Sequence, residues 1–460
     1  MEGVYNYKMN CFQTINPYTF VSIAEHLIDS ESIVQQKINA SQDAFRYWGI
    51  LKHWPKAEIL KKLAILLRVN KTFLGSQITA EMGKPITESL AEVEKCALTC
   101  EFYATHAATF LQNQDVKSEF IKSYISYQPL GIILGIMPWN FPLWQVIRFA
   151  IPTLSAGNVV LLKHAPNVLG CSKSLENLFL EAGFPEGVFQ SIVVETESIK
   201  AIIGDSRIKG VSLTGSESAG RAVASLAGNH IKKSVLELGG NDPFVVCKDA
   251  DLDKAVAAAI QSRMQNAGQV CISAKRIIVE QSVKDEFNSR FLKLVPNWTP
   301  GDPTLPSTKM GPLARIDLAE NIEKQYNEAV KHGAVSLTNY HRDNCLVYPM
   351  VLDNVCHASI AFREETFGPL AAIISAKTEE YAIALANDSC FGLGATIFTE
   401  DREKGERLAQ SINTGTVFVN EPVRSDPRFP VGGINNSGYG RELGSMGLME
   451  FVNVKSLIVN

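Results

Sequence analysis

The 460-residue sequence lacks a strong excess of either charge, since 44 lysines and arginines nearly balance 48 aspartates and glutamates, for a formal net charge of −4. This balance gives no electrostatic basis for binding nucleic acid or an anionic membrane, so we expect neither as a partner. The sequence also lacks an apolar run long enough to span a bilayer, and its first ten residues show no signal-peptide pattern. We therefore expect a cytoplasmic protein.

Signs of disulfides and of metal binding are scarce as well. The nine cysteines are scattered and odd in number, which argues against a disulfide framework in so long a chain. Cys96, Cys100 and His106 have a helical spacing that would suit a metal ion, but two buried helical thiols are the commoner arrangement. Neither His-Glu-x-x-His nor Cys-x-x-Cys occurs in the sequence, so we expect no metal site.

What the sequence does contain is a regular alternation of short apolar segments and amphipathic segments, after a helical region at 55–112. Apolar strands are expected at 131–136, 158–162, 188–194, 208–213, 243–246 and 276–279. Amphipathic helices are expected between them, at 141–154, 169–182, 217–226 and 252–264. This alternation predicts parallel sheets with helices on both faces.

The expected fold class is therefore α/β with more than one domain, as the length also favours. We expect a Rossmann-like cofactor domain from residues 1–118 and 134–236 and an α/β catalytic domain from residues 237–425. A small β arm is expected from residues 119–133 and 446–460. The apolar run at 456–459 must pair with something, and we expect the arm to join subunits of a homodimer or homotetramer.

Three short segments are candidates for chemistry. Glycines at 215 and 220 follow a strand and open a helix, whose N-terminus attracts phosphate, although no Gly-x-Gly-x-x-Gly follows the first strand. Glu237 precedes Leu-Gly-Gly at 238–240, and Cys271 ends the segment Gly-Gln-Val-Cys at 268–271. Taken singly, the cysteine is better interpreted as a buried apolar residue, and the glutamate could be a solvated turn residue.

Two further segments, Pro-Trp-Asn-Phe-Pro at 138–142 and Glu-Glu-Thr-Phe-Gly-Pro at 364–369, complete a pattern. With Glu-Leu-Gly-Gly and Gly-Gln-Val-Cys, they make the chain resemble the aldehyde dehydrogenase superfamily over essentially its whole length, in the family's order and at near-family separations. Residues 163–168 and 437–442 are most similar to bacterial succinate semialdehyde dehydrogenases.

This resemblance implies a mechanism. Cys271 is the nucleophile that forms a thiohemiacetal and then a thioester, because a thiolate is accessible near neutral pH. Asn140 and the backbone N–H of Cys271 stabilise the oxyanion, and Glu237 activates the water that hydrolyses the thioester.

The resemblance also implies a dinucleotide site. Its residues are Trp139, Lys163, Pro166, Gly215, Ser216, Leu238, Glu365 and Phe367. Family members that prefer NAD usually carry a glutamate three positions after the ribose-binding lysine, where this chain has Pro166. We therefore expect NADP to be accepted, with NAD also used, and His164 as a further donor to the 2′-phosphate.

A semialdehyde substrate would need a cation for its distant carboxylate. Arg148 matches an arginine with this role in succinate semialdehyde dehydrogenases; the alternative is that it bridges to a neighbouring acid on the helix surface. A second arginine of some such enzymes is replaced by Gln265, and Arg263 or Arg428 could compensate.

Three other functions stay open. The chain could be a general aldehyde dehydrogenase of broad substrate range, or a non-catalytic binding member of the family, although the latter usually loses the thiol or the base. An acylating enzyme that passes its acyl group to coenzyme A would not want a hydrolytic base, so Glu237 argues against that chemistry.

Overall fold

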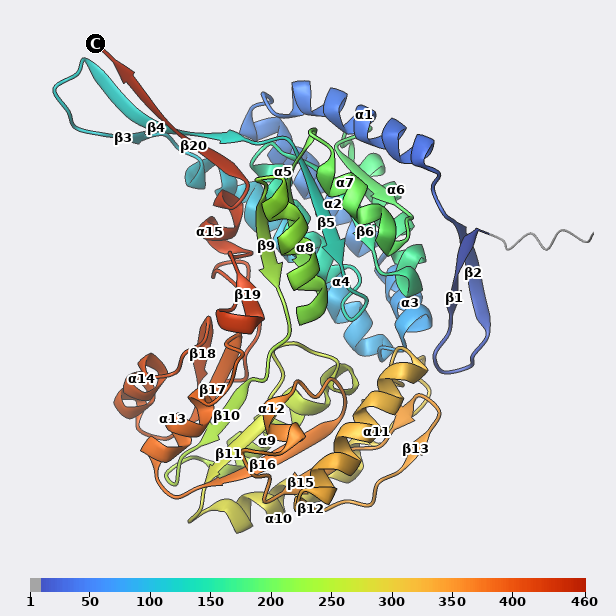
Figure 1. Cartoon of the computed structure of the whole chain (residues 1–460), viewed down its shortest axis with the longest axis vertical. Helices are drawn as coiled ribbons and strands as arrows, with labels where there is room; N and C mark the ends of the chain where they lie inside the picture. Colours follow the sequence, from blue (N-terminus) through green and yellow to red (C-terminus); the bar gives the residue numbers. More distant parts are fainter. Residues whose placement is uncertain (1–9) are drawn as a thin grey trace, which may run out of the picture.

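The protein is seen here in a computed structural model that describes residues 10–460. It has the expected α/β fold, built as two lobes, each around its own mainly parallel sheet, with a β arm projecting from one of them (Figure 1). The first nine residues of the expected cofactor domain, and with them nearly all of the segment tested for a signal peptide, lie outside the described residues.

The first lobe contains a six-stranded sheet in the order β19-β9-β8-β5-β6-β7. All neighbouring strands are parallel except β19, which runs antiparallel to β9. The strands are β5 (Ile132–Met137), β6 (Val159–His164), β7 (Phe189–Ile192), β8 (Ile208–Thr214), β9 (Lys233–Glu237) and β19 (Gly438–Tyr439). Most of their residues are buried, as expected for strands covered on both faces.

Eight helices that precede β9 in the described part of the chain accompany this sheet, and the long α4 packs closely against α2 and α5. They are α1 (Glu31–Trp48), α2 (His53–Val69), α3 (Lys71–Met82), α4 (Ile86–Phe110), α5 (Trp144–Ser155), α6 (Leu169–Ala182), α7 (Ile199–Gly204) and α8 (Glu217–Asn229). A hairpin of β1 (Cys11–Ile15) and β2 (Ser22–Leu27) lies at the side of the lobe (Figure 1).

The second lobe contains a seven-stranded sheet in the order β12-β15-β16-β11-β10-β17-β18. Its strands are β10 (Pro243–Val246), β11 (Arg276–Glu280), β12 (Val335–Ser336), β15 (Met350–Asp353), β16 (Leu370–Ala376), β17 (Gly394–Phe398) and β18 (Thr416–Val419). Its helices are α9 (Leu252–Met264), α10 (Lys284–Leu294), α11 (Ile316–Lys331), α12 (Ile360–Arg363), α13 (Glu379–Asn387) and α14 (Arg402–Gln410). A short ladder joins β13 (Arg342–Asp343) to β14 (Leu346–Val347).

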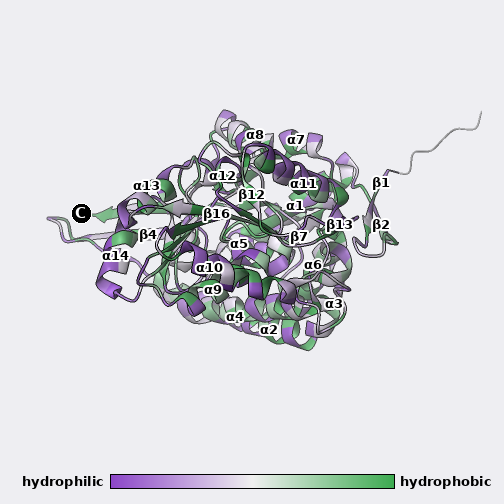
Figure 2. Ribbon diagram, turned by 90° about the horizontal axis from the view of Figure 1, so that it is seen from below, coloured by the Kyte–Doolittle hydropathy of each residue, from purple (hydrophilic) through white to green (hydrophobic). Residues whose placement is uncertain are grey.

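Each lobe has its own hydrophobic core, and Figure 2 shows hydrophobic colour in the central strands and hydrophilic colour along the outer helices. Apolar burial of this extent is the main force that holds each sheet against its helices. Each core therefore holds one lobe together, and a site can form where the two lobes meet.

The arm consists of β3 (Gln114–Asp115), β4 (Lys122–Pro129) and β20 (Val452–Val459), with β4 in the middle. The C-terminal strand thus pairs along its whole length with β4 of the same chain, because the β4 edge can satisfy its backbone groups. The other edge of β20 remains unpaired within the described residues, so it could take up a strand from a neighbouring subunit.

The secondary structure shifts two expected borders of the arm. Ile132 and Ile133 already belong to β5 in the first sheet, and the stretch before β20 forms α15 (Gly444–Met449). The chain also returns to the first sheet after residue 425, since β19 pairs with β9.

Candidate active site

The loop before Cys271 has a strained backbone. Asn266, Ala267 and Gly268 all have positive φ, at 50°, 53° and 78°. A Cβ added at Gly268 would lie 2.2 Å from the carbonyl oxygen of Gly368, so only glycine fits there. Consecutive left-handed residues cost free energy, which the surroundings must offset, and such strain tends to occur where a backbone is shaped for function.

Buried cations hold this loop in place. Arg263 is fully buried, and its Nη2 donates to the carbonyl oxygens of Gly268 at 2.7 Å and Gly368 at 2.8 Å. Lys275 Nζ donates to the carbonyl oxygen of Val270 at 2.9 Å. The expectation that Arg263 could meet a substrate carboxylate is therefore wrong, because its guanidinium is enclosed behind the loop. Its hydrogen bonds instead fix the backbone of the segment before Cys271.

Asn140 ties the first lobe to the same loop. The buried amide Nδ2 donates to the carbonyl oxygen of Gln269 at 2.9 Å, and Asn266 Nδ2 donates in return to the Asn140 carbonyl oxygen at 2.9 Å. These two bonds hold the Asn140 side chain beside the residues that lead to Cys271. The structure thus brings Asn140 and Cys271, both predicted from the sequence, close together, although they lie on different lobes.

Glu237 is the last residue of β9, and its side chain is buried. Burial raises the pKa of its carboxyl to about 8, while the nearby Arg148 guanidinium opposes the shift. Arg148 Nη2 lies 3.9 Å from Glu237 Oε2. A carboxyl poised near neutral pH can both accept and release a proton, as a general base must.

Cys271 lies at the junction of three cavities. It lines a large cavity of about 750 Å³ together with Asn140, a small one of about 20 Å³ together with Glu237 and Arg148, and a third of about 440 Å³. Burial raises the pKa of its thiol to about 11, and the charges of Arg148 and Lys275 pull the pKa down. No other described residue lines all three cavities, so a group held at Cys271 can be reached from three sides.

The largest cavity contains every residue that the sequence predicted for the dinucleotide. They are Trp139, Lys163, Pro166, Gly215, Ser216, Leu238, Glu365 and Phe367. The cavity opens at the carboxyl ends of β5, β6 and β8, where α/β sheets bind their ligands. Its volume and its position suit a dinucleotide.

The two ends of this cavity differ in charge. At one end Ser216 caps α8, accepting a hydrogen bond from Ala219 N at 3.3 Å, and Lys163 lines the wall. At the other end Glu365 lies 3.1 Å from Lys275 Nζ and accepts from Gly240 N at 3.1 Å. Glu365 carries the single carboxylate among the described lining residues, so an anionic phosphate meets no repulsion beside Lys163.

His164 does not take part in this cavity. It is buried, with Nε2 2.8 Å from the Pro142 carbonyl oxygen and Nδ1 accepting from Ala165 N at 2.8 Å. Burial lowers its pKa to about 4, so the ring is neutral. The expectation that His164 assists with a 2′-phosphate is therefore wrong, because both ring nitrogens already contact the backbone.

The third cavity runs outward from Cys271 between α4, α5 and the loop at 422–425. Arg148 and Gln265 both line it, as the sequence predicted for substrate residues. Arg428 is absent from the described lining residues, and its largely exposed guanidinium pairs with Asp426. Arg424, from the same loop, lines the wall in its place.

Arg148 has other partners in the structure. Its buried guanidinium forms an ion pair with Glu442, donates to Thr214 Oγ1 at 3.3 Å and lies close to Glu237. The Arg148 guanidinium therefore lies between two carboxylates. This arrangement favours the alternative in which Arg148 pairs with an acid over the expected contact with the substrate carboxylate.

Sequence reasoning missed Lys95 and Ser425, which line this third cavity. Lys95 Nζ donates to Ser425 Oγ at 2.7 Å, although 330 residues separate the two in the chain. No local motif marks either residue. The only available signal was the helical spacing of Glu88, Ala91, Glu92 and Lys95, which form the α4 wall of the cavity.

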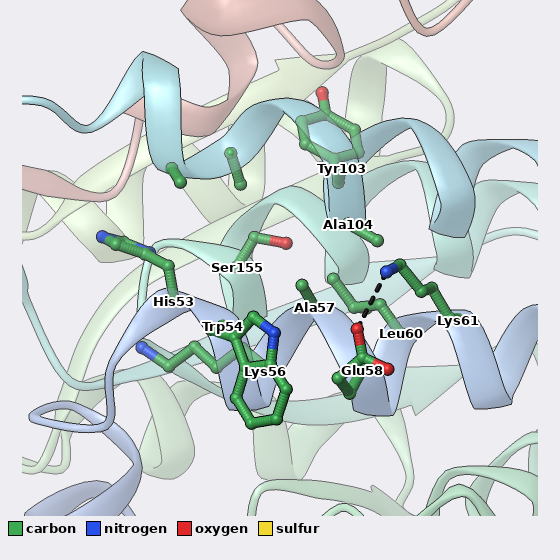
Figure 3. A pocket seen from close by; sticks show the side chains of 12 residues that line it. His53, Trp54, Lys56, Ala57, Glu58, Leu60, Lys61, Tyr103, Ala104 and Ser155 are labelled. Carbon is green, nitrogen blue, oxygen red and sulfur yellow. Dashed lines mark hydrogen bonds and ion pairs between the residues drawn. The ribbon is translucent and has the colours of Figure 1, made fainter.

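A separate pocket of about 210 Å³ lies between α2, α4 and the end of α5 (Figure 3). It holds His53, Trp54 and Lys56, with Glu58 bonded to Lys61 at its rim. None of the predicted site residues lines it.

Cys96 and Cys100 are both buried in α4, whereas His106 is exposed on that helix. Within residues 10–460, no three side chains of the metal-binding types gather into a potential ion site. In the same range, each helix is too short or too polar to cross a bilayer.

The chain is similar to known proteins over nearly its whole length. The protein-family model described as "Aldehyde dehydrogenase family" matches residues 5–457 of the sequence. A Synechocystis protein described as "Probable succinate-semialdehyde dehydrogenase [NADP(+)]" is 44% identical, covering 96% of this chain and 98% of its own. The Escherichia coli (strain K12) "Succinate semialdehyde dehydrogenase [NAD(P)+] Sad" is 42% identical, with 96% and 97% covered.

A solved structure agrees with these relatives. The crystal structure of succinic semialdehyde dehydrogenase from Streptococcus pyogenes in complex with NADP+ superposes with a TM-score of 0.95 at 34% identity. The match covers 97% of this chain and 99% of that one.

Proposed function

The chain belongs to the aldehyde dehydrogenase family, and from this premise we propose that it oxidises succinate semialdehyde to succinate with NADP, and also with NAD. The observation that carries the proposal is the position of Cys271, which faces a dinucleotide-sized cavity, a buried carboxyl and a cavity lined by cations. The printed names of the relatives support the same substrate and cofactors.

In the proposed mechanism Cys271 Sγ bonds to the aldehyde carbon. The thiol first gives up its proton to solvent, which Arg148 and Lys275 favour because both stabilise the negative charge left on the sulfur. The carbonyl oxygen becomes an oxyanion, and the Asn140 amide together with the Cys271 backbone N–H stabilises it. Asn140 is suited to this role because its hydrogen bonds hold it against the nucleophile loop before substrate arrives.

The tetrahedral carbon must next lose hydrogen with its bonding electrons, which leaves a thioester on Cys271. The chemistry that a nicotinamide supplies when bound is acceptance of this hydride. Glu365 and Phe367 would hold its ribose and ring end, while Lys163 and the start of α8 would hold the adenosine end and the phosphates.

Glu237 is proposed to activate the water that hydrolyses the thioester. Its carboxylate takes a proton from water, the hydroxide oxygen bonds to the acyl carbon, and the C–S bond breaks to release succinate and the Cys271 thiolate. Because the pKa of Glu237 is raised to about 8, it is a stronger base than an exposed glutamate.

Use of NADP is proposed from the charges near Lys163. Pro166 occupies the place where a carboxylate would repel a 2′-phosphate, and Lys163 has no acidic neighbour among the described lining residues. The hydroxyls of NAD can still reach the same lysine, so both cofactors should be turned over.

An assembly of two or four copies is also proposed. The arm extends away from the body (Figure 1). Val454 and Ile458 on β20 and Ile121 just before β4 are exposed. Apolar side chains on a projecting sheet with an unpaired edge are typical of a subunit contact.

An aldehyde panel tests the proposed function. Turnover of succinate semialdehyde and of butanal, which has the same chain length without the carboxylate, is measured with NADP and with NAD. We expect kcat/KM for succinate semialdehyde to exceed that for butanal by on the order of 10- to 100-fold, from one charge-assisted contact. Acid must form without coenzyme A, and Cys271→Ala must abolish turnover while retaining NADP binding.

Equal kcat/KM for the two aldehydes would instead indicate a general aldehyde dehydrogenase. A requirement for coenzyme A would indicate an acylating enzyme. Undetectable turnover of every aldehyde would indicate a non-catalytic binding member of the family.

A further inference from the structure

Lys95 extends from α4 into the third cavity, the one that also contains Cys271. Its ammonium donates to Ser425 Oγ at 2.7 Å and lies 4.1 Å from the centre of the Trp144 ring. Trp144 and Ser425 are both buried, so two walls of the cavity fix the nitrogen in place.

This ammonium has no carboxylate partner within the part of the chain that the structure describes, where its one hydrogen bond goes to a hydroxyl. The two other cations of the cavity are paired. Arg148 pairs with Glu442 and approaches Glu237, and Arg424 lies 2.9 Å from Glu421. Lys95 is therefore the cation of this cavity whose charge remains uncompensated.

An uncompensated cation inside a protein is costly, because burial removes water that would solvate it. Burial accordingly lowers the pKa of the Lys95 ammonium to about 8. An anion that enters the cavity removes this penalty, since it supplies both the opposite charge and hydrogen-bond acceptors. Ser425 can turn its hydroxyl hydrogen toward the same anion while it accepts from Lys95.

We propose that Lys95, with Ser425 beside it, binds the carboxylate at the far end of the aldehyde substrate. The proposal rests on the proposed function and specifies its substrate selectivity. The aldehyde carbon meets Cys271 at the inner end of the cavity, while the carboxylate meets the Lys95 ammonium between α4 and the 422–425 loop. Arg148 then acts on Glu237 and Glu442 rather than on the substrate.

Glu88 lines the same cavity and would repel a carboxylate when ionised. Burial raises the pKa of Glu88 to about 7, so a substantial fraction of the molecules carry it neutral at physiological pH. Its Oε2 accepts from Asn266 N at 3.0 Å, which directs the carboxyl toward the nucleophile loop.

The test compares Lys95→Met with wild type on succinate semialdehyde and on butanal. Methionine keeps an unbranched apolar side chain of similar length and removes only the charge and its donors. We expect kcat/KM for succinate semialdehyde to fall on the order of 10- to 100-fold, mainly through KM, as for loss of one charge-assisted hydrogen bond. The kcat/KM for butanal should stay within about twofold.

Arg428→Gln is the matched control, because it removes a nearby charge that is already paired with Asp426, largely exposed and outside the described lining of the cavity. It should change neither substrate by more than a few-fold. Ser425→Ala should weaken succinate semialdehyde less than Lys95→Met does, since it removes a neutral partner.

The outcomes distinguish failure of the proposed function from failure of the Lys95 assignment. If wild type shows no preference for succinate semialdehyde, the proposed function fails. If wild type shows the preference and Lys95→Met keeps it, the proposed function stands and the assignment of Lys95 is overturned. Loss of butanal turnover in both Lys95→Met and Lys95→Gln would make Lys95 a structural residue and would overturn the assignment as well.

Discussion

At the scale of single residues, burial moves the titration of two carboxyls and one lysine around the site toward neutral pH. Glu237 and Lys95 both have a pKa of about 8, and Glu88 has one of about 7. Burial penalises the charged form in every case, which raises the pKa of a carboxyl and lowers that of an amine. Binding of an anion and hydrolysis of the thioester should therefore depend on pH in opposite directions.

The selectivity for a carboxylate should fall as pH rises. Lys95 is a cation below its pKa, and Glu88 is neutral below its own, so both favour an anion at low pH. The groups whose charges act on Lys95 are Arg148, Cys96, Glu92 and Asp426. With a pKa of about 8, the ratio of kcat/KM for succinate semialdehyde to that for butanal should fall about tenfold between pH 7 and pH 9.

Taking a ratio cancels the ionisation of Cys271 and of Glu237, which both substrates share. Steady-state assays from pH 6 to pH 10 measure it, and Lys95→Met should lose the step near pH 8. A ratio that stays level in wild type would show that neither Lys95 nor Glu88 faces the substrate carboxylate.

The sequence could identify candidate residues that lie in short segments of adjacent positions. Cys271, Glu237, Asn140 and the eight cofactor residues all occur in short segments, and the structure places these segments around shared cavities. The partner of Arg148 is Glu442, which lies far away in the chain, so no local pattern could distinguish an ion pair from a substrate contact. Lys95 and Ser425 escaped notice for the same reason.

At the scale of elements, a buried ion pair fixes how α5 begins. Glu92 on α4 accepts from the backbone N–H groups of Leu143 and Trp144, each at 2.9 Å. The same carboxylate pairs with Lys84, and both side chains are buried. A carboxylate at a helix start satisfies donors that have no partner within the helix. This contact holds the segment that carries Asn140 against α4.

Glu92→Ala should therefore destabilise the protein by about 3–5 kcal/mol, because it leaves Lys84 buried without a counter-charge. Glu94→Ala is the control on the same helix. Glu94 pairs with Arg68 at a half-exposed site, where a pair is worth at most about 1 kcal/mol. Chemical denaturation followed by circular dichroism measures both variants, and equal losses would refute the special role of Glu92.

The alternation of strands and helices was predictable because burial on both faces leaves a continuous apolar run in each parallel strand. The helices at Leu169–Ala182 and Leu252–Met264 begin and end where the pattern predicted. The helix after Asn140 begins at Trp144 rather than at 141, since the Glu92 contact is a tertiary feature that the sequence of the helix does not contain. Helix α15 was missed because its two glycines are unfavourable for a helix.

At the scale of the whole molecule, the active site exists because two separate cores meet. The first lobe supplies Asn140, Glu237 and Lys163, while the second lobe supplies Cys271 and Glu365. The order of the motifs in the sequence could indicate which residues act together. It could not indicate that one thiol would line three cavities, because that depends on how the lobes pack. The cytoplasmic location and the number of subunits stay predictions.

The most direct test of the central claim is the covalent state of Glu237→Gln after mixing with NADP and succinate semialdehyde. We expect a burst of about one NADPH for each active site, then a stall, because hydride loss precedes hydrolysis and the base is absent. Mass spectrometry of the stalled protein should find one succinyl group, on the peptide that contains Cys271. Steady turnover without an adduct, or a succinyl group on another residue, would contradict the account.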